Sequence, residues 1–145
     1  MNLYAESSAV LAWLLGEPGS DPVREQLAGA DMVLSSDLTL VECERVLIRA
    51  HTGGRISEAE AADRHGRLVQ AAEHWAILAL GEEIVRRARR PFPVEPIRTL
   101  DALHLAAALQ ARALVPETRL LSLDERVRNC GKELGFELLP AAAMA

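Results

Sequence analysis

Residues 3–15 read LYAESSAVLAWLL, a short apolar run that passes directly into a longer apolar run with helical character. We expect a strand at Leu3–Ala5 that enters the core and a helix at Ala9–Leu15. Glu6 lies at the junction between the two. A carboxylate at the end of a buried strand is costly without a partner. The stretch therefore predicts a strand–helix unit with a chemically important acid at its junction.

Short apolar runs alternate with helical patterns along the rest of the chain. Further strands are expected at Met32–Ser35, Trp75–Leu78, Arg119–Leu123 and Phe136–Leu139. Further helices are expected from Asp21 onward, at Leu38–Ala50, from Ser57 to Ala72, at Glu82–Arg90, at Leu100–Arg112 and from Ser122 to Leu134. This order is typical of an α/β fold, here a three-layer α/β/α sandwich with a mostly parallel central sheet of four to five strands. We expect one domain over residues 1–140 and a short C-terminal tail at 141–145.

Small polar residues and acids mark where these helices begin. The expected N-caps are Ser7 or Ser8, Asp21 before Pro22, Ser36 and Thr99, and the expected capping boxes are Ser57 with Glu60 and Ser122 with Glu125. In a fold of this kind, ligands bind outside the carboxyl ends of the strands, near the point where the strand order reverses. Residues that directly follow a strand are therefore the first candidates for a functional site.

The composition excludes several classes of protein. The chain has 145 residues, of which 50% are hydrophobic, so it is neither disordered nor of low complexity. Aromatic residues make up 3%, which argues against a platform for stacking bases. The net charge is −5, and all basic residues except Lys132 are arginine. This acidity argues against a protein that binds nucleic acid by bulk charge, although an acidic site can still meet phosphate through a metal ion.

The cysteines and the apolar runs indicate a cytoplasmic protein. Cys43 and Cys130 have no partners at metal-ligand spacing, and we expect both to be reduced thiols. The N-terminal residues lack the basic segment of a signal peptide. No apolar run reaches about 18 residues, so no membrane span is expected.

Four acids are candidates for one rim of the predicted sheet. Glu6 follows the first strand and Asp124 follows the fourth, while Glu42 and Asp101 lie in early turns of the helices at 38–50 and 100–112. Carboxylates gathered at one place repel each other unless a cation compensates them. Mg²⁺ and Mn²⁺ prefer oxygen ligands, and a bound ion of this kind lowers the pKa of its water and stabilises charge on a phosphoryl group.

Structural interpretations of the same residues stay open at this point. Asp101 and Asp124 stand near helix starts, where any acid gains about 0.3–1 kcal/mol from the helix dipole. Glu42 has Arg45 three residues further on and can form a surface ion pair with it. His104 lies three residues after Asp101 and either orients that acid or is a hydrogen-bonded core histidine.

Four sequence blocks, taken in order, resemble the PIN-domain family, and most of all the VapC-like toxins of type II toxin–antitoxin systems. The blocks are YAESSA at 4–9 followed by GEPGS at 16–20, SSDLTLVE at 35–42, TLDALHLA at 99–106 and LSLDER at 121–126. Each block alone is weak, but the four together span nearly the whole chain. The resemblance implies a PIN-like sandwich and a metal-dependent endoribonuclease, a hydrolase of RNA phosphodiester bonds that uses Mg²⁺ or Mn²⁺.

The resemblance also implies roles for individual residues. The metal-binding and catalytic acids would be Glu6, Glu42, Asp101 and Asp124, supported by the hydroxyls of Ser8 and Ser122. Glu6 is a departure, because the family usually has Asp there, and the extra methylene would shift the metal or require a bridging water. RNA contacts are expected from Arg45, Arg49 and Arg98. The cluster Arg86, Arg87, Arg89 and Arg90 is expected to be a solvated helix end that complements the helix dipole.

The implied partners are an RNA substrate, a cognate antitoxin protein and a second copy of the chain in a homodimer. Two other functions remain in competition with the ribonuclease. One is an inactive PIN-type module that binds an antitoxin or RNA. The other is a Mg²⁺-binding domain for phosphoryl signalling, which usually needs a lysine beside the pocket, and Lys132 is poorly placed for that.

Overall fold

The computed structural model describes residues 1–141, so the predicted tail at 141–145 lies outside the described residues except for Ala141. Five parallel strands form one sheet, in the order β3-β2-β1-β4-β5. The strands are β1 Asn2–Ala5, β2 Met32–Ser36, β3 Ala76–Leu78, β4 Arg119–Leu121 and β5 Leu138–Leu139. The helices are α1 Ser7–Leu15, α2 Ser20–Gly29, α3 Asp37–Thr52, α4 Glu58–His74, α5 Glu82–Ala88, α6 Thr99–Leu114 and α7 Glu125–Glu133.

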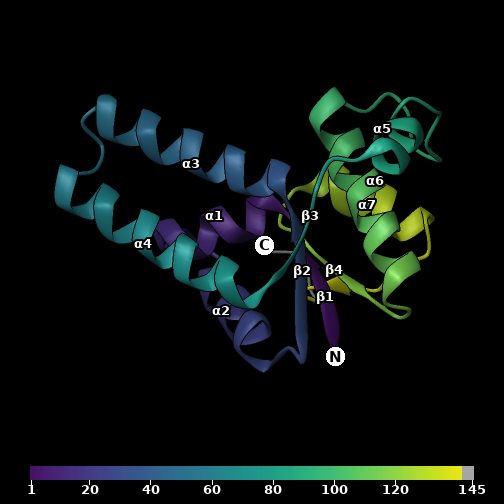
Figure 1. Cartoon of the computed structure of the whole chain (residues 1–145), viewed down its shortest axis with the longest axis horizontal. Helices are drawn as coiled ribbons and strands as arrows, with labels where there is room; N and C mark the ends of the chain where they lie inside the picture. The colour runs from purple at the N-terminus through teal and green to yellow at the C-terminus, as the bar shows by residue number, and fades with distance from the viewer. Residues whose placement is uncertain (142–145) are drawn as a thin grey trace.

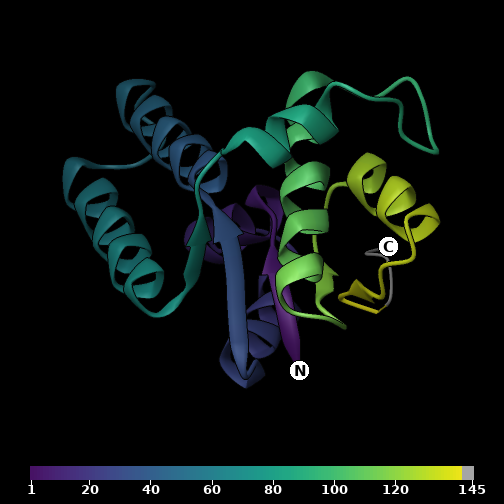
Figure 2. The same ribbon diagram turned by 45° about the vertical axis from the view of Figure 1, so that its right-hand side comes forward.

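Helices cover both faces of the sheet. Helices α1 to α4 lie on one side and α5 to α7 on the other (Figure 1), and the turned view shows the same separation (Figure 2). Side chains alternate along each strand, so β1 sends Leu3 and Ala5 into the core under α1 to α4, and Tyr4 into the core under α5 to α7. The predicted three-layer sandwich with a parallel sheet is confirmed.

The order of the strands places the ends of β1 and β4 at the reversal point. The chain runs outward from β1 through β2 to β3 and then crosses back over β1 to reach β4, which pairs with β1 on its other side. Ala5 is in register with Leu121, and the amide of Glu6 donates to the carbonyl of Leu121 at 3.0 Å. The residues that follow these two strands therefore emerge side by side, where ligands bind in such folds.

Local signals predicted some helix starts and missed others. Ser36 caps α3, and Ser57 with Glu60 forms the predicted capping box of α4. The other predicted caps are wrong, because α1, α2, α6 and α7 are preceded by Glu6, Gly19, Arg98 and Asp124. Ser8 and Ser122 do not cap because their hydroxyls are engaged with Glu6 instead.

Both cysteines, Cys43 and Cys130, are buried and free, as expected. Within residues 1–141, no helix has the length and apolar character needed to cross a membrane.

Candidate active site

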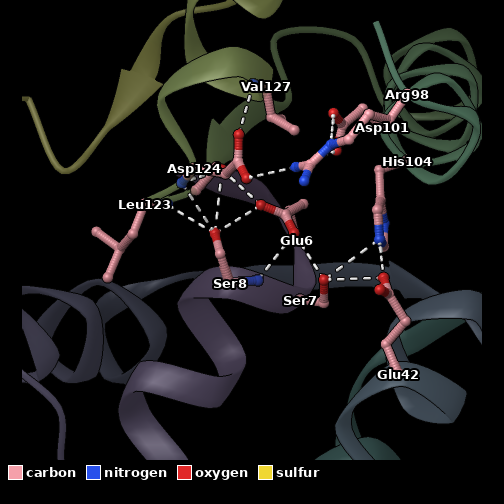
Figure 3. Close-up of polar contacts among 11 residues, drawn as sticks. Glu6, Ser7, Ser8, Glu42, Arg98, Asp101, His104, Leu123, Asp124 and Val127 are labelled. Atoms are coloured by element: carbon pink, nitrogen blue, oxygen red, sulfur yellow. Dashed lines mark hydrogen bonds and ion pairs between the residues drawn. The ribbon is translucent and has the colours of Figure 1, made fainter. Parts of the chain in front are cut away.

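The four predicted acids line one cavity at the carboxyl edge of the sheet. Its volume is about 460 Å³, and its walls come from the starts of α1, α3 and α6 and from the loop after β4 (Figure 3). The lining residues are Glu6, Ser7, Ser8, Leu11, Glu42, Arg98, Thr99, Leu100, Asp101, His104 and Asp124. Residues up to 118 positions apart in the sequence are thus brought to one place.

Glu6 is buried in a cage of hydrogen-bond donors. One carboxylate oxygen, Oε2, accepts from the Ser7 hydroxyl at 2.7 Å and from the Ser8 amide at 2.8 Å. The other, Oε1, accepts from the hydroxyls of Ser8 and Ser122, both at 2.6 Å. Glu6 as a whole is 3% exposed. Four donors stabilise the negative charge of this buried carboxylate, which no cation pairs within the described residues.

Ser8 ties the cage to the loop that carries Asp124. Its oxygen accepts from the backbone amides of Leu123 at 2.9 Å and Asp124 at 3.1 Å. The Ser122 oxygen also accepts from the Asp124 amide, at 3.1 Å. Asp124 itself caps α7, since its Oδ1 accepts from the Val127 amide at 3.0 Å. These contacts fix Asp124 beside Glu6 and leave its Oδ2 directed into the cavity (Figure 3).

One guanidinium bridges the two aspartates. Arg98 donates to Asp101 through Nε at 3.0 Å and through Nη2 at 3.4 Å, and the same Nη2 lies 3.4 Å from Asp124 Oδ2. The Asp101 side chain is only 8% exposed, whereas the Arg98 side chain is 61% exposed. The cation therefore sits at the mouth of the cavity and compensates two carboxylates that would otherwise repel each other.

Glu42 is paired with His104 and not with Arg45. His104 Nε2 contacts Glu42 Oε1, and the Ser7 hydroxyl lies 3.0 Å from that oxygen and 3.2 Å from Nε2. His104 does not orient Asp101, because α3 packs against α6 at this point and presents Glu42 to the ring. The other ring nitrogen, Nδ1, is buried and has no partner within residues 1–141. Ser7 therefore links the Glu6 cage to the Glu42–His104 pair.

The pairing shifts the protonation of both partners. The hydrogen bond from His104 lowers the pKa of Glu42 below its ordinary value, although partial burial opposes this. Burial by itself disfavours protonation of His104, but the hydrogen bond to Glu42 and the charges of Glu6, Glu42 and Asp101 together raise its pKa above the usual 6.5. The raised pKa favours the protonated form of His104, in which the ring carries a positive charge beside Glu42.

The stability of the metal-free protein should depend on pH through His104. Because its pKa is raised in the folded state, its contribution is complete below the unfolded value of 6.5 and is lost as the pH rises through the folded value. We expect the free energy of unfolding in EDTA to fall as the pH rises through this window, and His104→Gln to flatten the fall. Urea denaturation at a series of pH values measures this.

His65→Gln is the matched control for His104. His65 also contacts a glutamate, Glu44, at 2.7 Å, but its side chain is 56% exposed and solvent screens the pair. The control should keep the pH profile of the parent. Identical profiles for the parent and His104→Gln would contradict the prediction.

The four carboxylates suit a hard divalent cation, although Arg98 and His104 contact three of them in this structure. Within residues 1–141, no three Asp, Glu, His or Cys side chains converge closely enough to hold a metal ion as they stand. The four carboxylates offer only oxygen ligands, as Mg²⁺ and Mn²⁺ prefer. Arg98 already shows that Asp101 and Asp124 accept a shared cation. The residues present therefore fit such an ion.

Of the three arginines predicted to contact RNA, one lies at the acidic cavity and two do not. Arg98 lines the cavity, but Arg45 and Arg49 are exposed on α3 and are not among its lining residues.

Ser7, which the sequence predicts only as a helix cap, contacts both Glu6 and Glu42. Its position next to Glu6 was the one local signal for that role, and the bridge itself depends on α3 and α6.

Comparison with known proteins agrees with this geometry. The family model described as PIN domain matches residues 3–133. Ribonuclease VapC46 of Mycobacterium tuberculosis is 33% identical over 137 residues, which cover 94% of this chain and 95% of that protein.

Two solved structures share the fold. The crystal structure of VapC20 from Mycobacterium tuberculosis, described as a sarcin–ricin loop cleaving toxin, has a TM-score of 0.67 at 13% identity. A toxin–antitoxin complex from Klebsiella pneumoniae has a TM-score of 0.63 at 16% identity. Each match covers 98% of this chain and 99% of the other. Together with the family match, these likenesses show that the chain belongs to the PIN domain family and resembles its VapC members over nearly its full length.

Proposed function

We propose that this protein is a Mg²⁺- or Mn²⁺-dependent endoribonuclease and the toxin of a type II toxin–antitoxin pair. The observation that carries the proposal is the convergence of Glu6, Glu42, Asp101 and Asp124 on one cavity at the switch point of the sheet. The similarity to ribonuclease VapC46 supports the choice of RNA as substrate.

The proposed chemistry is hydrolysis of an RNA phosphodiester by water. The four carboxylates would hold one or two ions, which supply a water of lowered pKa and positive charge beside the phosphoryl group. Glu6 is held in place by the hydroxyls of Ser7, Ser8 and Ser122. These hydroxyls position the carboxylate, and the nucleophile of the proposed reaction is water. Arg98, at the mouth of the cavity, can pair with a substrate phosphate.

A cleavage assay with metal removal tests the proposal. Purified protein is incubated with structured RNAs and Mn²⁺, with or without EDTA, and the products are separated on gels. We expect cleavage that depends on Mn²⁺ and stops in EDTA. Cleavage that EDTA does not affect would contradict metal dependence, and a titration without Mg²⁺ or Mn²⁺ binding would contradict the four-acid site. Binding of an antitoxin or RNA with no cleavage under any condition would favour the inactive module instead.

Arg98 should compete with the metal ion for the same oxygens. We expect Arg98→Met to tighten Mn²⁺ binding on the order of tenfold, because the internal cation no longer neutralises Asp101 and Asp124. Arg119→Met is the control, since Arg119 pairs with Glu137 away from the cavity. Electron paramagnetic resonance of free Mn²⁺ measures the affinity without relying on catalysis. An unchanged or weaker affinity in Arg98→Met would contradict the competition.

The proposal extends to partners and location. An antitoxin partner is supported by the structural likeness to a toxin–antitoxin complex. A homodimer is supported by an apolar cavity of about 610 Å³ beside the edge strand β3, where Met32 and Leu114 are exposed. Light scattering of the purified chain measures that assembly. The RNA substrate and the free thiols of Cys43 and Cys130 are consistent with a cytoplasmic protein.

A further inference from the structure

A second cavity shares a wall with the acidic one. Its volume is about 540 Å³, and it lies between the end of α5, the proline-containing segment 91–97 and the start of α6. Arg98 and Thr99 line both cavities. In Figure 2, the segment that joins α5 to α6 extends beyond the start of α6, which carries the acidic site. The second cavity therefore opens beside the first, on the far side of Arg98.

The charge of this second cavity is opposite to that of the first. Arg89, Arg90 and Arg98 line it, and Glu95 is the only acid among its described lining residues. The Glu95 carboxylate is already engaged, since it accepts from the backbone amides of Phe92 at 2.8 Å and Ile97 at 3.0 Å. Arg89 and Arg90 are exposed and form no ion pair within residues 1–141.

The neighbouring arginines on α5 have structural partners. Arg86 pairs with Glu82 at 2.5 Å and with Glu83 at 3.2 Å. Arg87 donates to the carbonyls of Arg90 and Pro91, and its guanidinium lies 4.1 Å from the centre of the Phe92 ring. The four arginines that were predicted to form a solvated helix end therefore fall into two pairs with different surroundings. Arg86 and Arg87 hold the local structure, and Arg89 and Arg90 are left without an acid at the rim of a cavity.

We propose that this arginine-lined cavity binds backbone phosphates of the RNA strand next to the bond that is cut. The inference rests on the proposed function and adds a binding site to it. Guanidinium groups match phosphate oxygens in charge and in geometry. The acids of the first cavity repel RNA, and the whole chain is acidic, so the strand needs a local positive surface beside the reaction site.

The cavity offers backbone contacts and not base stacking. Its one aromatic lining residue within the described chain, Phe92, is 5% exposed and is covered by Arg87. Contacts to phosphate position a strand but carry no sequence information directly. Binding at Arg89 and Arg90 should therefore be strongly dependent on salt and insensitive to the RNA sequence.

The test measures RNA binding apart from cleavage. The full chain and its variants are titrated in EDTA against a short fluorescein-labelled single-stranded RNA at several salt concentrations, and a gel confirms that the RNA stays intact. We expect Arg89→Ala/Arg90→Ala to weaken binding by about tenfold, and to reduce the slope of log K against log salt by about 1.4, or about 0.7 for each lost phosphate contact. The same changes should follow with RNAs of different sequence.

The matched control removes the same amount of charge elsewhere. Arg24→Ala/Arg86→Ala deletes two exposed arginines that are paired with acids, Arg24 with Asp21 at 2.7 Å and Arg86 with Glu82. We expect its affinity and salt slope to stay close to those of the parent. All the substituted side chains are exposed, so equal melting temperatures should confirm that both double variants are folded.

Three outcomes would overturn the inference: no RNA binding by the parent, no change in the Arg89→Ala/Arg90→Ala variant, or an equal loss in the control. A variant that binds RNA normally but loses binding of a polyglutamate peptide would assign the cavity to an acidic protein segment instead. Failure of the proposed function gives a different result. In that case the parent cuts no RNA with Mn²⁺, while the binding difference between the two double variants is still measured.

Discussion

Asp101→Asn is expected to lower the rate of RNA cleavage by at least about a hundredfold, because it removes one charged ligand from the proposed ion site while keeping the size of the side chain. Asp101 is buried at the start of α6, so its charge is little screened by solvent. Single-turnover cleavage at saturating Mn²⁺ measures the rate. Weaker Mn²⁺ binding by the same variant would locate the defect in the ion site.

Asp37→Asn separates this role from a contribution to helix stability. Asp37 occupies the first turn of α3, as Asp101 occupies the first turn of α6, but Asp37 is exposed and does not line the acidic cavity. Both substitutions remove a favourable interaction with a helix dipole. We expect only Asp101→Asn to lose activity. Equal cleavage by the parent and Asp101→Asn would contradict the catalytic role of this acid.

Leu105→Ala is expected to lower the free energy of unfolding by about 3 kcal/mol, because it leaves a cavity in a tightly packed region. Leu105 is fully buried in the middle of α6, the helix that also carries Asp101 and His104. It packs in the core between the sheet and helices α5 to α7. Urea denaturation in EDTA measures the change without a contribution from metal binding.

Leu114→Ala provides the control for this prediction. It is the same substitution on the same helix, but Leu114 is 62% exposed at the C-terminal end of α6. At protein concentrations where light scattering shows a monomer, its removal should change the free energy of unfolding by less than about 0.5 kcal/mol. Equal losses in the two variants would mean that helix propensity, and not burial, determines the effect.

Much of the fold could be predicted from local patterns. The five strands were found within one or two residues of their observed ends, because short apolar runs between turn residues are strong signals. The helix starts were less predictable. Ser8 and Ser122 have the residue type of a cap, but the hydroxyl of each donates to Glu6 instead. Glu6 lies 116 residues from Ser122 in the sequence and precedes the helix that contains Ser8. A cap rule considers only neighbouring residues and cannot detect such a competitor.

The arginines show the same limit at the proposed substrate surface. The predicted RNA contacts of Arg45 and Arg49 rest on their positions three and seven residues after Glu42, yet both residues are exposed on α3 outside the acidic cavity. Arg89 and Arg90 had no sequence signal for a site. Only the return of the chain through segment 91–97 brings them beside Arg98. Spacing along one helix therefore did not predict which arginines lie near the acidic cavity.

The sequence by itself determined the α/β layers, the four acids and the family, because each depends on residue type and short-range order. The tertiary structure decided how those acids are compensated. Arg98 reaches Asp101 and Asp124, His104 pairs with Glu42, and three serine hydroxyls enclose Glu6. Charges compensate each other only when they lie close together in space. That closeness arises only when α1, α3, α6 and the loop after β4 meet at the edge of one sheet.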